Sequence, residues 1–240
     1  QRVVVVTGAG ISTESGIPDF RSPGGVWSRY KPVMYQEFLD DHDARKRYWI
    51  YKKEFYKNMS ASKPNAAHRA VAELERLGKL WFLITQNIDG LHRDAGNSPD
   101  KIIELHGTNR FIQCVSCGQR FSAEEMMPQI QNTDVPQCPC GGWLKPATIS
   151  FGQSMPVKET NAAQQAASTC DAFLVVGSSL QVQPAASMPL VAARSGAKLA
   201  IVNLEPTPLD REAHVTWSEK AGAALSAIVQ HLKEIIAGKN

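Results

Sequence analysis

The feature that most constrains the fold of this chain is a set of short apolar runs, each followed at once by glycine or polar residues. They cover residues 3–7, 80–85, 172–177 and 198–203. Runs of this length without alternation are typical of strands buried on both faces of a parallel sheet. Helical patterns lie between them, so the sequence predicts an open α/β sheet with right-handed crossovers.

Weaker strand patterns cover residues 101–105 and 214–217, and helical patterns cover 65–77, 157–168, 184–194 and 219–236. An aromatic-rich helix is expected over residues 35–59. Ligands of an open parallel sheet bind at the carboxyl ends of its strands. Polar residues gather after these runs, at Gly8, residues 85–87, His106, residues 177–179 and Asn203. The sequence therefore predicts one binding site along this edge of the sheet.

A glycine turn follows the first run without a linker, and its residues are Gly8, Ala9, Gly10, Ile11 and Ser12. Such a turn is typical of a phosphate cradle, in which backbone N–H groups and a helix N-terminus favour negative charge. Thr13 breaks the G-x-G-x-x-G pattern, and the usual acidic ribose contact is missing downstream. An ordinary dehydrogenase is therefore disfavoured, and a tight turn without a ligand is the alternative.

Four of the five cysteines lie close together: Cys114, Cys117, Cys138 and Cys140. Two thiolate pairs at this spacing can close a tetrahedral zinc site, although only one residue separates the second pair. Four thiolates leave no open coordination position, so the ion would be structural. This use of cysteine favours a reducing compartment, and hence the cytoplasm, over a disulfide framework. Cys170 stands apart and is expected to be a small buried thiol.

His106 is the strongest candidate base among the six histidines, because a strand pattern precedes it and Gly107 follows it. Asn87 could bind a hydroxyl or position a water, and Asp89 could accept a hydrogen bond from an amide. The alternative for both is an Asx turn that satisfies its own backbone. His68 and His92 are expected to be structural.

Composition argues against two classes of partner. The net charge of +3 is too small to argue for direct nucleic-acid binding. The densest basic stretch, residues 45–53, is interpreted as the solvated side of a helix. No apolar run approaches the roughly 18 residues that a membrane helix needs. A monomer is expected, because no extended apolar helix is left over for a partner.

Motifs spread over almost the whole chain occur in the order found in sirtuins, the NAD-dependent protein-lysine deacylases. The chain resembles this family at residues 8–12, 16–22, 85–92, 104–107, 151–152, 177–180 and 203–205 and at the four clustered cysteines. It is most similar to the class II branch, which includes bacterial relatives. The resemblance implies a Rossmann-like α/β domain with a smaller inserted lobe, made of a zinc-binding module and a helical module.

The expected division follows the chain. The Rossmann-like domain takes residues 1–17, 64–110 and 149–240. The cofactor-binding loop and helical module take 18–63, and the zinc-binding module takes 111–148.

The resemblance also implies the site residues, with His106 as general base and Asn87 as the second catalytic residue. Those implied to contact NAD are Gly8, Ala9, Gly10, Ile11, Ser12, Asp19, Phe20, Arg21, Gln86, Asn87, Ile88, Asp89, Gly177, Ser178, Ser179, Asn203, Leu204, Glu205 and Ala221. An acylated-lysine protein or peptide would lie as a strand along Ile149, Phe151, Gly152, Gln181 and Val182.

In the implied reaction, the acyl oxygen attacks C1′ of the nicotinamide ribose and nicotinamide leaves. The ribose 2′-hydroxyl, deprotonated through His106, then attacks the resulting O-alkylimidate, and hydrolysis leaves free lysine and acyl-ADP-ribose. Phe20 would shield the reacting face from water. Protein mono-ADP-ribosylation at the same site is the alternative. A binding module without activity is disfavoured, because both His106 and Asn87 are present.

Two departures from the family pattern concern the substrate. Gln153 follows Phe151-Gly152 where the family has glutamate. Trp49 and Lys52 stand where the branch selective for succinyl and malonyl groups has tyrosine and arginine. This argues against a strong preference for acidic acyl groups. The likeness to the class II branch keeps longer acyl chains open.

Overall fold

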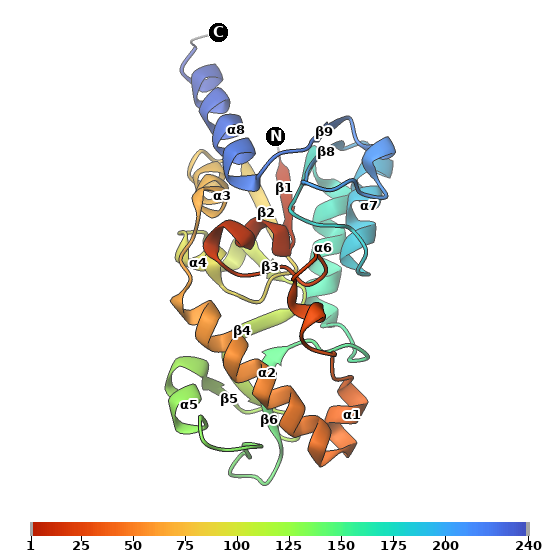
Figure 1. Cartoon of the computed structure of the whole chain (residues 1–240). Coiled ribbons are helices and arrows are strands. Elements are labelled where there is room, and N and C mark those ends of the chain that lie inside the picture. Colours follow the sequence, from red (N-terminus) through yellow and green to blue (C-terminus); the bar gives the residue numbers. More distant parts are fainter. Residues whose placement is uncertain (1, 239–240) are drawn as a thin grey trace.

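The larger lobe is built on a six-stranded sheet of order β3-β2-β1-β7-β8-β9 in a computed structural model that describes residues 2–238 (Figure 1). Its strands are β1 (Val3–Thr7), β2 (Leu80–Thr85), β3 (Ile102–Glu104), β7 (Ala172–Val176), β8 (Lys198–Val202) and β9 (Val215–Trp217). All neighbouring pairs are parallel. The predicted parallel sheet is confirmed, with strand ends within one residue of the apolar runs.

Helices cover both faces of this sheet, which is why its strands are apolar throughout. Val4 and Val6 pack in one core cluster with residues of α6 (Val157–Thr169) and α7 (Met188–Arg194). Val5, which points to the opposite face, packs with residues of α3 (Ala66–Arg76) and α8 (Ala221–Ile236). Two separate cores therefore hold the ends of β1, β2, β7 and β8 in fixed positions.

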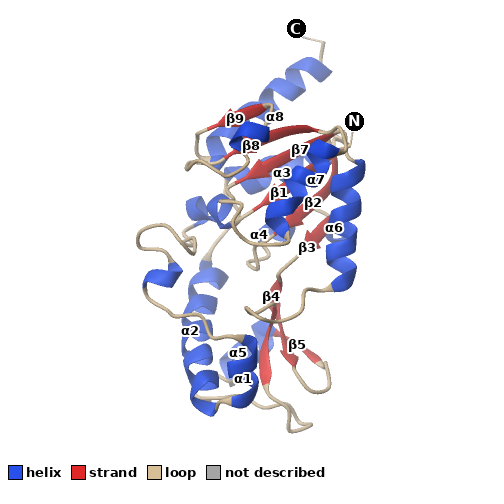
Figure 2. Ribbon diagram, turned by 90° about the vertical axis from the view of Figure 1, so that its right-hand side faces the viewer, coloured by secondary structure: helices blue, strands red, loops and turns tan. Residues whose placement is uncertain are grey.

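The smaller lobe combines three helices with an antiparallel sheet of order β5-β4-β6 (Figure 2). Its elements are α1 (Tyr35–Asp40), α2 (His42–Ala61), β4 (Gly107–Cys114), β5 (Arg120–Ser122), α5 (Ala123–Gln129) and β6 (Leu144–Thr148). Trp49 of α2 is fully buried, and its Nε1 donates to the carbonyl oxygen of Leu144 at 3.1 Å. The helices and the small sheet thus share one core.

The sequence did not indicate several of these elements. The helix expected over 35–59 is two helices, because Asp41 has an extended backbone and its carboxylate accepts from the N–H groups of Asp43 and Ala44 to start α2. The pattern at 184–194 begins as a 3₁₀ turn, and α7 starts only at Met188. The short strands β4, β5 and β6 and the helices α4 (Leu91–Asp94) and α5 were not expected.

The interpretation of residues 45–53 as a solvated helix side is wrong for two of its cations. Arg45 is 6% exposed, and its guanidinium donates to the carbonyl oxygens of Phe38 and Leu39. Lys52 is also buried. One face of helix α2 is buried because it packs against α1 and the small sheet. Among the described residues, no helix is long and apolar enough to span a membrane.

Candidate active site

A cavity of about 850 Å³ is lined by residues of both lobes and by the carboxyl ends of β1, β2, β7 and β8. The loops after these strands bring most of the expected site residues to its wall. The expected residues that line it are Gly8, Ala9, Gly10, Asp19, Phe20, Arg21, Gln86, Asn87, Ile88, His106, Ile149, Phe151, Gly152, Gly177, Ser178, Ser179, Val182, Asn203, Leu204, Glu205 and Ala221. The residues that follow the strands therefore meet at one edge of the sheet, as the sequence predicted.

Ile11, Ser12, Asp89 and Gln181 do not line this cavity. Ile11 is fully buried in the core beneath α8. Ser12 Oγ donates to Asp89 Oδ2 at 2.8 Å and accepts from Asn87 Nδ2 at 3.0 Å. Burial raises the pKa of the Asp89 carboxyl. Ser12 and Asp89 therefore lie behind the wall and orient Asn87. Near Gln181, the side of the cavity is formed by Val182 and Gln183.

The glycine turn has a different physical role from the one expected. The N–H of Gly8 donates to the carbonyl oxygen of Val176 at 3.1 Å, and that of Gly10 donates to Gly177 at 2.9 Å. At Gly177, with φ +60°, an added Cβ would lie 2.4 Å from the backbone nitrogen of Ile11. These glycines let two strand-end turns touch, and their N–H groups bond within the protein. The bare backbone left on the surface still suits close approach by a dinucleotide.

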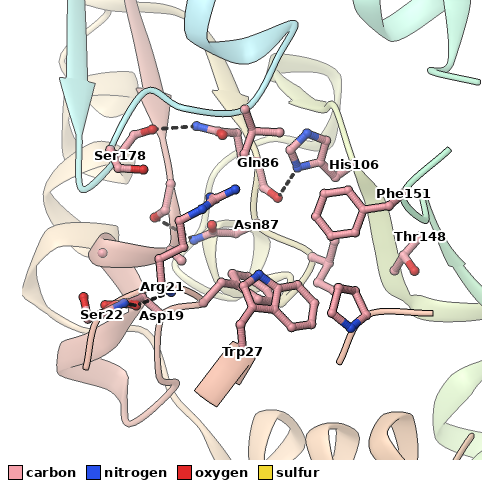
Figure 3. Close-up of a pocket in the computed structure, with 18 of the residues that line it drawn as sticks. Asp19, Arg21, Ser22, Trp27, Gln86, Asn87, His106, Thr148, Phe151 and Ser178 are labelled. Carbon is pink, nitrogen blue, oxygen red and sulfur yellow. Dashed lines mark hydrogen bonds between the residues drawn. The ribbon is translucent and has the colours of Figure 1, made fainter. Parts of the chain in front are cut away.

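His106 is held by a backbone acceptor. Its Nδ1 lies 3.0 Å from the carbonyl oxygen of Gln86, so Nδ1 carries the proton and Nε2 keeps its lone pair (Figure 3). Burial lowers the pKa of His106, so the neutral ring predominates at neutral pH. Gln86 is fixed in turn, because its Nε2 donates to Ser178 Oγ at 2.9 Å. The result is an oriented base at the cavity wall.

Asn87 is the most constrained polar side chain of the site. Its Nδ2 donates to the carbonyl oxygen of Gly8 at 3.1 Å as well as to Ser12. Its N–H donates to Thr85 Oγ1 at 3.0 Å. Both amide hydrogens have acceptors, so Oδ1 is the atom left to receive a hydrogen bond from a ligand. This arrangement fits recognition of a hydroxyl or a water, as the sequence suggested.

Sequence reasoning missed an aromatic wall. Trp27 packs against both Phe20 and Phe151, at ring-centroid distances of 5.2 and 5.9 Å. Trp27 and Phe151 are labelled in Figure 3. The available signal was a tryptophan that follows Gly24-Gly25-Val26, in a segment rich in glycine and proline. These rings can exclude water from the adjoining part of the cavity.

The acyl-pocket expectation needs a correction for Trp49. Trp49 points into the small-lobe core and does not line the cavity, whereas Tyr48 and Lys52 do. Tyr48 Oη is buried without a hydrogen-bond partner, and Thr148 and Ser150 are its polar neighbours. Burial lowers the pKa of Lys52 to about 8.

His68 and His92 are structural, as expected. Both are buried, and burial lowers the pKa of each. His68 Nδ1 accepts from the N–H of Asn65, and its Nε2 lies 3.4 Å from Ser12 Oγ. His92 Nε2 lies 3.0 Å from Thr7 Oγ1. They therefore support the polar layer behind the cavity.

The four clustered cysteines fit one zinc ion. The Sγ atoms of Cys114, Cys117, Cys138 and Cys140 all lie within 4.8 Å of one another. Two of the separations are 3.5 and 3.8 Å. A tetrahedron with Zn–S bonds of about 2.3 Å has edges of about 3.8 Å, so the one-residue gap in the second pair is no obstacle. Cys170 lies apart, and burial raises the pKa of its thiol to about 11.

The comparisons agree with this geometry. The family model described as the Sir2 family matches residues 8–184. The NAD-dependent protein deacetylase of Thermodesulfovibrio yellowstonii is 47% identical over 96% of this chain and 90% of its own length. The NAD-dependent protein deacylase 2 of Archaeoglobus fulgidus is 40% identical over 98% of this chain and 92% of its own.

A Sir2 structure with a deacetylated p53 peptide and 3′-O-acetyl-ADP-ribose superposes with a TM-score of 0.89 at 37% identity, covering 96% of this chain and 93% of that one. A Sir2 complex with a p53 peptide and NAD⁺ gives 0.88 at 36% identity, with the same shares covered. The family model, over residues 8–184, includes Asn87, His106 and the four clustered cysteines. The chain belongs to the Sir2 family, the sirtuins.

Proposed function

We propose that this protein is an NAD-dependent protein-lysine deacylase, which transfers the acyl group of an acyl-lysine side chain to ADP-ribose and releases nicotinamide. The observation that carries this conclusion is a neutral, oriented His106 in the same cavity as the constrained Asn87. Relatives with 40–47% identity are named NAD-dependent protein deacetylases or deacylases. NAD is the co-substrate, and one structural zinc is held by the cysteine cluster.

NAD would lie along the strand ends. Its contribution to the chemistry is a ribose carbon that becomes electrophilic as nicotinamide departs. The adenosine half would bind beside Gly177, Ser178, Ser179, Asn203, Leu204, Glu205 and Ala221, and the nicotinamide half beside Gln86, Asn87 and Ile88. Ser12 and Asp89 would act on this half through Asn87, since neither reaches the cavity wall.

His106 Nε2 would accept the proton of the ribose 2′-hydroxyl, because Nδ1 already donates to Gln86. Phe20 and Trp27 would keep water from the reacting carbon. The acyl-lysine peptide would lie along Ile149, Phe151, Gly152 and Val182, all of which line the cavity.

We also propose a domain organisation, an oligomeric state and a location for this protein. The Rossmann-like domain would comprise 1–17, 64–110 and 149–240, with the cofactor loop and helical module at 18–63 and the zinc module at 111–148. A monomer is proposed because the sequence leaves no extended apolar helix for a partner. A cytoplasmic location is supported by the four clustered cysteines, which suit zinc in a reducing compartment.

The direct test is a mass-spectrometric assay of one lysine peptide carrying acetyl, butyryl, octanoyl, lipoyl or succinyl groups, with and without NAD. NAD-dependent loss of the acyl group is expected. Transfer of ADP-ribose to protein, with no deacylated peptide, would instead favour the mono-ADP-ribosyltransferase alternative, whose chemistry has no evident need for His106.

A further inference from the structure

The peptide side of the cavity ends in a tight turn. In residues 150–153 the N–H of Gln153 donates to the carbonyl oxygen of Ser150 at 3.0 Å, and Gly152 at the third position has φ +79°. This is the backbone of a type II turn, which requires a positive φ at that position. The turn projects Phe151 into the cavity, near His106 and Thr148 in Figure 3.

Backbone hydrogen bonds tie the two ends of this segment to different elements. The N–H of Ile149 donates to the carbonyl oxygen of His106 at 2.8 Å. The carbonyl oxygen of Phe151 accepts from the N–H of Tyr35, at the start of α1, also at 2.8 Å. The shape of residues 149–152, called here the peptide segment, thus depends on contacts that also reach the base.

Lys145 lies beneath this segment. It is 3% exposed, and its Nζ donates to the carbonyl oxygens of Pro146 and Thr148 and to Gln153 Oε1, the last at 3.4 Å. Gln153 Oε1 also accepts from the N–H of Ser150 at 3.0 Å. The ammonium group of Lys145 and the carboxamide of Gln153 therefore join the end of β6 to both ends of the turn.

All three acceptors of Lys145 are neutral. In residues 2–238 no aspartate or glutamate forms an ion pair with it. The groups that face it are Lys52 of α2, a second buried cation, and the ring of Tyr35 of α1 at 6.0 Å. Burying an ammonium without a carboxylate is costly unless its donors are used, so the three hydrogen bonds account for its presence here.

We propose that Lys145 and Gln153 are positioning residues, which hold the peptide segment in the shape that receives the acyl-lysine peptide. Because all three acceptors of Lys145 are neutral, this hold weakens when the ammonium loses its proton. This inference rests on the proposed function and specifies how its peptide side is kept in place. Neither residue touches the reacting atoms; each acts through Ser150, Thr148 and the turn.

The direction of the pH effect follows from the geometry. The ammonium can donate to all three acceptors, whereas the amine has fewer hydrogens and no charge to strengthen them. Burial, with Lys52 nearby, lowers the pKa of Lys145 to about 7. The hold is therefore complete in mild acid and is lost as the pH rises through neutrality.

The test measures binding of a fluorescent acetyl-lysine peptide to the full chain by anisotropy, from about pH 6 to about pH 9. Wild type is expected to bind roughly tenfold more weakly at the upper end, with NAD affinity unchanged. Lys145→Met should bind weakly at every pH. Gln153→Glu supplies a carboxylate, which keeps the ammonium charged, and should flatten the profile.

Lys53→Met is the matched control, because Lys53 also donates to two backbone carbonyls, those of Gln131 and Thr133, but lies away from the cavity. It should bind the peptide as wild type does. If Lys145→Met fails to fold, Gln153→Glu and Gln153→Leu carry the test, since both leave Lys145 in place.

Failure of the proposed function and failure of the positioning role would give different results. A wild-type chain that binds no acyl-lysine peptide and removes no acyl group would overturn the proposed function together with this inference. A wild-type chain that deacylates normally, but whose peptide-binding profile is the same in Gln153→Glu, would overturn the positioning role alone. Wild-type affinity in a folded Lys145→Met variant would do the same.

Discussion

The carbonyl oxygen of Gln86 accepts from Nδ1 of His106 at 3.0 Å, and this contact decides which ring nitrogen can act as a base. Gln86 follows β2 and His106 follows β3, so two neighbouring strand ends set the orientation of the ring. Gln86 is itself anchored to Ser178, after β7. The base is therefore positioned by the strand ends of the parallel sheet.

The burial of His106 predicts the acid side of the pH profile. Burial lowers the pKa of His106 from its ordinary value of 6.5, and the base works only when unprotonated. At saturating peptide and NAD, kcat should be flat around neutrality and fall about tenfold per pH unit only below about pH 6.5. Steady-state rates over the acid range provide the check. An inflection above that value would contradict the assignment of His106 as the base.

The cysteine cluster predicts one bound zinc ion per chain. Cys138→Ser should lose the metal, and the small lobe should unfold, because structural zinc sites contribute on the order of 10 kcal/mol to folding. Elemental analysis and thermal unfolding measure the two effects. Cys170→Ser is the control, since that thiol lies outside the cluster. Equal zinc content in the two variants would exclude the proposed ligand set.

Adding a side chain at Gly177 is expected to lower the free energy of unfolding. An added Cβ would meet Ile11 N at 2.4 Å and the backbone has φ +60°, so Gly177→Ala should cost about 2–4 kcal/mol. Gly196→Ala is the matched control: its φ is +93°, but nothing lies within 4 Å of the added atom, and about 1 kcal/mol is expected. Urea unfolding of both variants measures the difference. Equal losses would mean that the contact between the two turns matters little.

Replacing Lys52 by an apolar residue is expected to change the preference for acyl groups. Its ammonium is buried at the cavity wall, 5.3 Å from the centroid of the Tyr48 ring, where a long apolar chain would meet a polar group. Lys52→Met should raise the ratio of octanoyl to acetyl kcat/KM by roughly tenfold. Lys57→Met, on the exposed side of the same helix, should leave the ratio unchanged. If the ratio does not move in Lys52→Met, this wall is not where the acyl chain ends.

The larger lobe was predictable because burial on both faces leaves a strong signal. Val4, Val5 and Val6 alternate between two cores, so β1 reads as an uninterrupted apolar run. The small sheet gave no such signal. Its strands β5 and β6 have three and five residues, and metal ligation replaces part of the apolar burial that would otherwise mark them.

From the residue patterns alone the site was predictable to the level of the strand ends, and the resemblance to sirtuins added residues such as Phe20 and Phe151. The polar residues after β2 could be placed at the cavity, but the position of Ser12 behind its wall depends on the 3₁₀ turn Ala9–Ser15. Likewise, Tyr48 and Lys52 share one face of α2, while Arg45 and Trp49 share another. Which face meets the cavity is decided by packing between the lobes.

The most direct test of the account is the stoichiometry of the reaction, measured by quantitative mass spectrometry on wild type and His106→Tyr in the presence of NAD and an acetyl-lysine peptide. Wild type should yield nicotinamide, deacetylated peptide and acetyl-ADP-ribose in equal amounts, and the folded, zinc-loaded variant should yield no deacetylated peptide. Release of nicotinamide with free acetate in place of acetyl-ADP-ribose, or comparable deacetylation by His106→Tyr, would contradict it.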